Sequence, residues 1–142
     1  MSLSEKEKNY RILVVDDEAD VLDFLSMFLS SLGWEITTVS SAARALDEMD
    51  NHPYFLVLTD IAMPDMDGYE FVSCIKRKQI ASQLVLMTGF GYNPNHTLIK
   101  INKSIRYPCL FKPFDRAKVA ETVQKAWNEF NKSLLTAENG AP

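Results

Sequence analysis

Short runs of consecutive apolar residues alternate along this chain with stretches in which apolar residues recur every three or four positions. A short apolar run is typical of a strand buried in a parallel sheet, whereas the three-to-four spacing predicts an amphipathic helix. The runs predict strands at residues 11–15, 34–39, 55–59, 83–87 and 107–111. The spacing predicts helices at 18–32, from Ser40 or Ser41 to about Met49, at 69–78, around Leu98, Ile101 and Ile105, and after Asp115.

Residues at the helix ends and along the helix faces refine these elements. Gly33 is expected to close the first helix in a left-handed conformation, and Asp115 is expected to cap the last one. The side chains predicted to face the core are Val21, Leu25, Phe28 and Leu32 in the first helix and Val119, Val123, Trp127 and Phe130 in the last.

A strand followed by a helix occurs five times, which is the pattern of an α/β protein. Right-handed crossovers put helices on both faces of the sheet, so we expect a doubly wound five-stranded parallel sheet in a three-layer sandwich. Two strand orders satisfy the local pattern. The order 2-1-3-4-5 is favoured because it puts the first and third strands side by side at the switch point, where open sheets bind ligands.

Composition narrows the class of protein. The 142 residues suit one domain, with a polar tail at 1–9, the domain at 10–131 and a flexible tail at 132–142. The net charge of −4 comes without a basic block, which disfavours direct nucleic-acid binding. No apolar stretch approaches about 20 residues and the N-terminus lacks a signal-peptide core, so we expect a cytoplasmic protein. Two cysteines in no metal-ligand spacing predict reduced, buried thiols.

Polar side chains stand at the ends of four predicted strands, namely Asp16, Asp17, Asp60, Thr88 and Lys112. Parallel strands present their carboxyl ends at one edge of the sheet, so we expect these side chains to lie together in the crevice at that edge. Carboxylates at that range repel, and a hard cation relieves the repulsion, with Mg²⁺ preferred and Mn²⁺ or Ca²⁺ as substitutes. An alternative is that Asp16 and Asp17 only cap the first helix. That alternative does not explain why an acidic residue, Asp60, ends a buried strand.

Four segments together resemble the receiver domain of two-component response regulators. They are VVDDE at 14–18, DIAMPDMDG at 60–68, MTG at 87–89 and KPF at 112–114. Each stands at the matching strand end in the matching order, and the similarity covers about residues 11–130. The resemblance implies a flavodoxin-like fold. It also implies a signalling domain in a phosphorelay, which is no enzyme beyond catalysing its own phosphorylation and dephosphorylation.

The resemblance implies that Asp60 is the phosphoacceptor. Its carboxylate would attack the phosphorus of a phosphohistidine on a histidine kinase or a histidine phosphotransfer protein, giving an aspartyl phosphate. Mg²⁺ is the implied cofactor, and its implied protein ligands are Asp17, Asp16 directly or through water, Asp60 and the backbone carbonyl of Ala62. Such phosphoryl transfer depends on positioning and charge neutralisation.

Two more residues complete the implied site. Lys112 would pair first with Asp60 and then with a phosphoryl oxygen, and the Thr88 hydroxyl would bond another phosphoryl oxygen. The peptide between Lys112 and Pro113 is implied to be cis, a form that is accessible at low cost only before proline.

The chain departs from the family pattern near this site. Cys109 stands where the family usually has an aromatic residue whose rotation follows the Thr88 hydroxyl, and Tyr107 is the candidate replacement. Ala62 offers no polar group to orient a water, and Phe90 could shield the phosphorus. We therefore expect slow loss of the phosphoryl group.

Several partners and contexts are implied. Phe24 and Met27 extend the apolar surface of the first helix, where a phosphodonor could dock. An output domain or effector outside this chain and a phosphorylation-dependent dimer are further options. A freestanding regulator, a domain of a transcription factor and the receiver of a hybrid kinase all stay open.

Three other functions compete with this interpretation. A flavin-binding protein of the same fold needs a phosphate loop rich in Ser, Thr and Gly after the first strand, where this chain has acidic residues. A hydrolase with an aspartyl intermediate typically has a second Asp at the position of Ala62. A pseudo-receiver, which binds partners without being phosphorylated, is left for experiment to distinguish.

Overall fold

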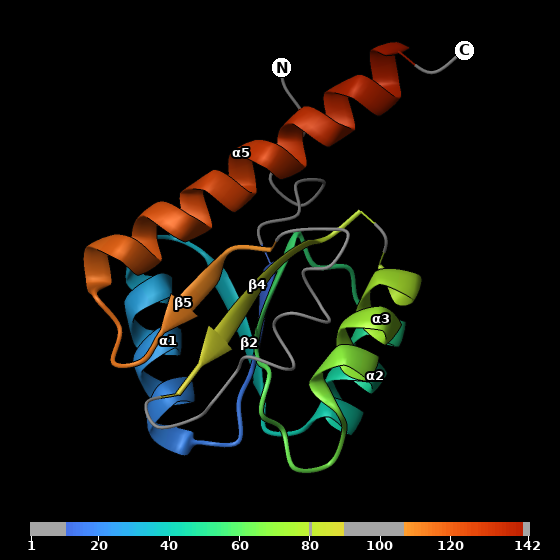
Figure 1. Ribbon diagram of the computed structural model, residues 1–142. Helices are drawn as coiled ribbons and strands as arrows, with labels where there is room; N and C mark the ends of the chain where they lie inside the picture. Colours follow the sequence, from blue (N-terminus) through green and yellow to red (C-terminus); the bar gives the residue numbers. More distant parts are fainter. Residues whose placement is uncertain (1–10, 80, 90–106, 141–142) are drawn as a thin grey trace.

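The computed structural model describes residues 11–79, 81–89 and 107–140, which form a sheet flanked by helices (Figure 1). The strands are β1 (Arg11–Val15), β2 (Glu35–Val39), β3 (Leu56–Asp60), β4 (Gln83–Thr88) and β5 (Cys109–Phe111). The helices are α1 (Ala19–Ser31), α2 (Ala42–Asn51), α3 (Gly68–Lys78) and α5 (Arg116–Gly140). The predicted helix around Leu98, Ile101 and Ile105 and the predicted tail at 1–9 lie outside the described residues.

The sheet order is β2-β1-β3-β4-β5, and every strand pair is parallel. This confirms the predicted doubly wound sheet of order 2-1-3-4-5. In register, Val15 stands beside Val39 and Thr59, and Asp60 stands beside Met87. The carboxyl ends of β1, β3 and β4 therefore reach the same edge of the sheet.

Two apolar layers hold the helices against the sheet. Successive side chains of a strand point to opposite faces, and β1 supplies both layers with fully buried residues. Leu13 and Val15 pack in a cluster with residues of α2 and α3, whereas Ile12 and Val14 pack with residues of α1 and α5. Figure 1 shows the same division, with α2 and α3 on one side of the sheet and α1 and α5 on the other.

The predicted signals at the helix ends are present. Gly33 has a φ of 101° after α1, and its N–H donates to Ser30 O at 3.0 Å. The Ser41 side chain accepts a bond from the first turn of α2, and the Asp115 side chain accepts from the first turn of α5. Each of these contacts satisfies a backbone group that the helix itself leaves unpaired.

The buried face of α1 differs from the prediction at two residues, because Leu29 was not predicted to be buried and Leu32 was. Leu25 and Leu29 are fully buried, Val21 and Phe28 are half-buried, and Leu32 is 49% exposed. The helix ends at Ser31, so the backbone of Leu32 has left the helical path. The helical spacing that predicted a buried Leu32 therefore does not apply to this residue.

Helix α5 continues to Gly140, past residue 131 where the domain was expected to end. Most of the tail predicted at 132–142 is thus helical. The physical reason lies in the residue types of this segment, because Lys, Leu, Ala and Glu favour helices and no proline occurs between Pro113 and Pro142. On the inner side of α5, the buried apolar residues are Val119, Val123, Ala126 and Phe130, with Trp127 partly buried against the same cluster.

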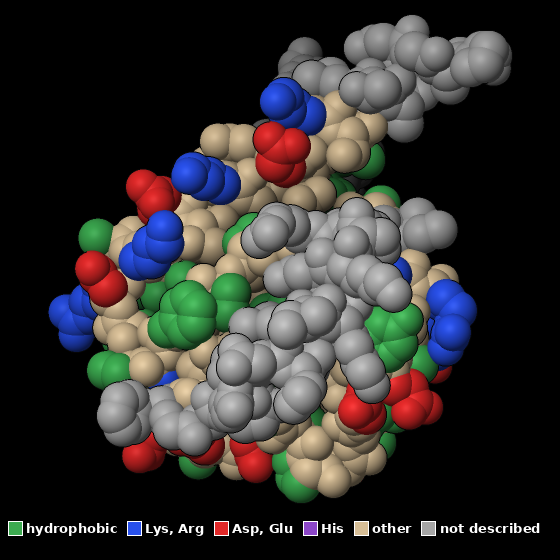
Figure 2. All heavy atoms as spheres, viewed as in Figure 1, with side chains coloured by type: hydrophobic (Ala, Val, Ile, Leu, Met, Phe, Trp, Pro, Cys, Tyr) green, Lys and Arg blue, Asp and Glu red, His purple; other side chains and the backbone are tan. Residues whose placement is uncertain are grey.

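Charges of both signs alternate along the exposed face of α5 (Figure 2). Lys118 pairs with Glu121 and Lys132 with Glu129, both at 3.6 Å. Exposed pairs of this kind contribute little stability, typically about 0–1 kcal/mol. Among the described residues, no helix combines the length and the apolar character needed to cross a membrane.

Candidate functional site

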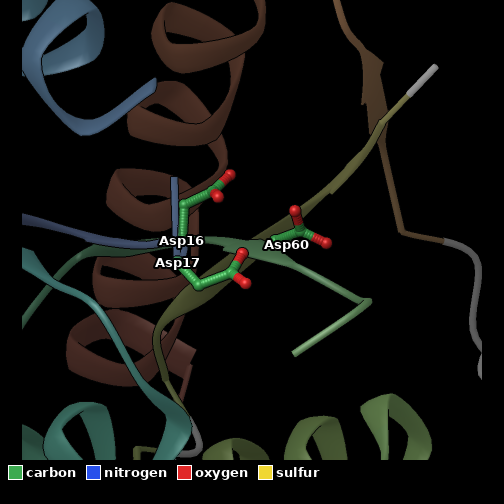
Figure 3. Close-up of side chains that lie close together, drawn as sticks. All are labelled: Asp16, Asp17 and Asp60. Carbon is green, nitrogen blue, oxygen red and sulfur yellow. The ribbon is translucent and has the colours of Figure 1, made fainter. Parts of the chain in front are cut away.

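Three carboxylates meet where β1 and β3 end (Figure 3). Asp16 and Asp17 directly follow β1, and Asp60 is the last residue of β3. One oxygen of each lies within 4.8 Å of the others. Asp16 is fully buried and Asp60 is 4% exposed, whereas Asp17 is exposed. Neighbouring parallel strands lie about 4.8 Å apart, so the β1–β3 pairing itself brings these side chains together.

Lys112 reaches this cluster from the segment after β5. Its Nζ lies 2.6 Å from Asp16 Oδ2, 2.8 Å from Asp60 Oδ2 and 3.2 Å from Glu18 Oε1. The side chain is only 9% exposed, and its backbone N–H donates to Thr88 O at 2.9 Å. The Lys112–Pro113 peptide is cis, as the resemblance implied. One buried ammonium thus joins two buried carboxylates from different strands.

Both oxygens of Asp60 have donors. Oδ2 accepts from Lys112 Nζ, and Oδ1 accepts from the backbone N–H of Ala62 at 2.7 Å. The next residue along, Ile61, donates its own N–H to Met87 O at 3.2 Å, which fixes the start of the loop against β4. The Asp60 carboxylate is therefore held in one orientation at the mouth of the sheet.

The charges perturb one another because they are buried. Burial raises the pKa of Asp16 to about 6; Lys112 opposes the shift, and the neighbouring Asp60 carboxylate adds to it. Burial alone would lower the pKa of Lys112, but its contacts with Asp16 and Asp60 outweigh burial and raise it. The ammonium is therefore charged at neutral pH.

The cluster fits a hard divalent cation. The three carboxylates supply oxygen ligands within reach of one ion, which suits Mg²⁺, Mn²⁺ or Ca²⁺ better than a metal that prefers sulfur. Asp16 Oδ2 also lacks an aligned hydrogen-bond donor although it is buried, so Lys112 compensates its charge without satisfying its directional bonding. The exposed Asp17 carboxylate gives the site an opening to solvent.

Thr88 ends β4 beside this site and is 2% exposed. Its register neighbour in β5 is Phe111, and Cys109 stands two positions earlier in that strand, opposite Leu86. Burial raises the pKa of the Cys109 thiol, and a hydrogen bond with Thr88 opposes the shift. Cys74 and Cys109 are both free, as expected, but each is half-buried rather than buried.

Tyr107 precedes β5, which is shorter than the strand predicted at 107–111. Tyr107 packs against the layer that contains α2 and α3. Phe90 lies outside the described residues.

Two contacts were not foreseen from the sequence. Glu18 lies beside Lys112, although only the two aspartates before it were assigned a role. Asp65 accepts hydrogen bonds from the first residues of α2, more than 20 positions away in the chain. The acidic run at 16–18 could have indicated the first contact. No local pattern indicates the second, because it depends on how α2 and the loop after β3 meet.

The sequence matches the family model of the response regulator receiver domain over residues 12–124. The chain therefore belongs to this family. It is 30% identical over 118 residues to the response regulator receiver protein CpdR of Brucella abortus, covering 81% of this chain and 94% of CpdR. It is also 30% identical over 115 residues to the transcriptional regulatory protein FixJ of Bradyrhizobium diazoefficiens, covering 81% of this chain but 55% of FixJ. The similarity to Escherichia coli ZraR is again 30% over 118 residues, with 83% of this chain and 26% of ZraR covered.

Solved structures support the same assignment. The beryllofluoride-activated NtrC4 receiver domain dimer is 30% identical, with a TM-score of 0.75, and the match covers 85% of this chain and 98% of that one. A CheY-like receiver domain protein from Methanospirillum hungatei is 25% identical, with a TM-score of 0.79 and coverage of 89% and 99%. The flavodoxin-like fold and the interpretation as a response regulator receiver domain are thereby confirmed.

Proposed function

We propose that this receiver domain accepts a phosphoryl group on Asp60. The observation that carries the proposal is the position of Lys112 Nζ, 2.8 Å from Asp60 and 2.6 Å from Asp16 at the mouth of the sheet. A buried carboxylate held by one ammonium and one backbone N–H presents a fixed nucleophile beside positive charge. This is the arrangement that phosphoryl transfer requires.

The donor is a phosphohistidine on a histidine kinase or a histidine phosphotransfer protein. An Asp60 oxygen forms a bond to phosphorus while the bond between phosphorus and the imidazole nitrogen breaks. The imidazole leaves with that electron pair and takes a proton from solvent, and Asp60 becomes a mixed anhydride. Lys112 then neutralises charge on a phosphoryl oxygen, and the Thr88 hydroxyl donates to another.

Asp16, Asp17 and Asp60, with the backbone carbonyl of Ala62, would hold Mg²⁺. The bound ion supplies positive charge that offsets the negative charge on the transferring oxygens. In its absence the three carboxylates repel, and Lys112 is the described cation that lies between Asp16 and Asp60.

Docking of the phosphodonor is proposed beside α1. A groove of about 430 Å³ next to Lys112 is lined by residues that include Val21, Phe24 and Phe114. Phe24 stacks on Phe114 at 6.2 Å, so it forms the groove wall rather than standing free, whereas Met27 is 76% exposed. We also propose cytoplasmic location and a phosphorylation-dependent dimer, with the output carried by a domain or effector outside this chain.

The test is incubation with acetyl phosphate, with Mg²⁺ or with excess chelator, followed by intact mass measurement. The wild type should gain one phosphoryl group with Mg²⁺ and almost none with the chelator. Asp60→Asn should gain none. The matched control is Asp67→Asn, an aspartate in the same loop that caps α3, which should still gain the group.

The outcome separates two functions on the same fold. A gain that disappears in Asp60→Asn supports phosphoryl transfer to this residue. No gain in a folded wild-type protein that binds Mg²⁺ would instead support a pseudo-receiver. A gain retained in Asp60→Asn would place the acceptor elsewhere and contradict the proposal.

A further inference from the structure

Asp65 connects the loop after β3 to the N-terminus of α2. Its Oδ1 accepts the backbone N–H of Ala42 at 3.2 Å, and its Oδ2 accepts the N–H of Ala43 at 3.1 Å. The next N–H, that of Arg44, donates to Ser41 Oγ at 3.2 Å. Two of the backbone donors that a helix start leaves unpaired are thus satisfied by a residue more than 20 positions away.

The same loop carries the groups that orient Asp60. It runs from β3 to α3, and its Ala62 N–H bonds to Asp60 Oδ1 at 2.7 Å. At its far end Asp67 caps α3 by accepting the N–H groups of Tyr69 and Glu70. Between these two points, Asp65 is the residue whose side chain bonds to a different helix.

We propose that Asp65 is a positioning residue, which ties this loop to α2 and so keeps the Ala62 amide against Asp60. The contact has two bonds to one carboxylate, which fixes direction as well as distance. A negative charge at a helix N-terminus is also favoured by the helix dipole. The proposal extends the proposed function, and its Mg²⁺ and phosphorylation measurements depend on that function, whereas its hydrogen-exchange measurement does not.

Removing the Asp65 carboxylate should make the position of the loop less precise, without removing any group that reacts. Without the Asp65 carboxylate, the middle of the loop loses its bonds to α2, while Ile61 and Met63 stay buried in the core. The loop should remain in place on average but open more often. Each opening removes the Ala62 amide from Asp60 and displaces the Ala62 carbonyl proposed as a metal ligand.

The experiment compares Asp65→Ala with Ser41→Ala in the full chain. Both remove a cap from the same helix end, but the Ser41 side chain accepts its bond from Arg44 within α2, whereas Asp65 bonds to α2 from the loop. The first measurement is hydrogen exchange at the Ala62 amide without metal, by nuclear magnetic resonance. The second is the affinity for Mg²⁺ by calorimetry, and the third is the rate of phosphorylation by acetyl phosphate.

Asp65→Ala should speed exchange at the Ala62 amide by at least about threefold, because local opening sets that rate. It should weaken Mg²⁺ binding and slow phosphorylation by roughly tenfold, the lower end of the effect of changing residues that support metal ligands. Ser41→Ala should change none of the three by more than about twofold, although both variants lower the melting temperature. Asp65→Asn keeps one acceptor oxygen and should lie between the wild type and Asp65→Ala, so it also serves if Asp65→Ala fails to fold.

Equal effects of the two alanine variants, or no effect of Asp65→Ala on the Ala62 amide, would overturn the proposal. If the wild type accepts no phosphoryl group, the proposed function fails. The exchange measurement still decides the positioning role in that case, because it needs neither metal nor phosphate.

Discussion

Lys112 Nζ lies 2.8 Å from Asp60 Oδ2, and the same ammonium lies 2.6 Å from Asp16 Oδ2. All three side chains are almost completely buried, so their charges are compensated chiefly by one another. Removing one partner from such a group leaves uncompensated buried charge, which costs more than the loss of an exposed pair. Lys112 therefore stabilises the fold as well as the proposed site.

Replacing Lys112 by Met should destabilise the protein and tighten Mg²⁺ binding at the same time. Without Mg²⁺, we expect the free energy of unfolding to fall by about 3 kcal/mol, the lower end of the cost of removing one partner of a buried pair. A divalent cation should restore much of that loss, because the remaining carboxylates are more negative without the ammonium. Urea unfolding at several Mg²⁺ concentrations measures both effects. Lys78→Met, which breaks the exposed pair with Asp50, is the control and should show neither.

Tyr54 should make stability depend on alkaline pH. It is 2% exposed and donates its hydroxyl to Glu48 Oε1 at 2.6 Å. Burial and this bond raise the pKa of Tyr54 from 10 to about 12. Because the folded value is the higher one, the contribution is complete below pH 10 and is lost as pH rises from 10 to 12.

The loss assigned to Tyr54 should reach roughly 2–3 kcal/mol by pH 12. The measurement is the difference in unfolding free energy between the wild type and Tyr54→Phe across this range. The wild type should lose more stability with pH than Tyr54→Phe does. Tyr69→Phe, which changes a tyrosine that is 47% exposed, should follow the wild type, and parallel curves for all three proteins would contradict the prediction.

Much of the fold could be predicted because the strands are buried on both faces. An apolar run such as Ile12–Val15 predicts a strand in a sheet that is covered on both faces. Right-handed crossovers between such strands then place helices on both sides of the sheet. The strand order needed one further constraint. That constraint came from the aspartates at 16, 17 and 60, which have a common purpose only if β1 and β3 are neighbours.

The features that could not be predicted depend on contacts between distant segments or on where a helix stops. Leu32 fits the helical spacing, yet α1 ends one residue earlier and leaves it exposed. The bonds from Asp65 to α2 need both elements to be placed first. At Cys109 the sequence showed that an aromatic ring is absent, and only the structure shows the residue packed against the layer that contains α2 and α3.

Phe55 should be the most sensitive of the aromatic residues behind α5. It is fully buried, and its ring centroid lies 5.2 Å from that of Trp34 and 5.0 Å from that of Trp127. Phe55→Ala leaves a cavity among these rings, so we expect a loss of about 3–5 kcal/mol in chemical unfolding. Met27→Ala, at a position that is 76% exposed, should change stability by less than about 0.5 kcal/mol. A loss in Phe55→Ala as small as the loss in Met27→Ala would contradict this prediction.

Gly33→Ala tests backbone strain without a steric clash. Gly33 has a φ of 101°, and an added Cβ would meet nothing within 4 Å. The whole cost should therefore be conformational, about 1–2 kcal/mol. Gly33→Asn should cost less, because asparagine tolerates a positive φ better than alanine does. Thermal and urea unfolding measure the difference. An unchanged stability in Gly33→Ala would mean that the end of α1 relaxes to a negative φ.

Ala62 should determine how long the proposed aspartyl phosphate survives. It lies two residues after Asp60 and has no polar side-chain group that could orient a water toward phosphorus. Ala62→Asn adds such a group, and we expect it to shorten the lifetime by up to about a hundredfold, the lower end of what a positioned acid or base contributes. The measurement is the decay of the phosphorylated mass after acetyl phosphate is removed. Ala62→Val adds bulk without a polar group and should decay no faster than the wild type. Faster decay in both variants would mean that any enlarged side chain disturbs the site, and that water orientation is not the cause.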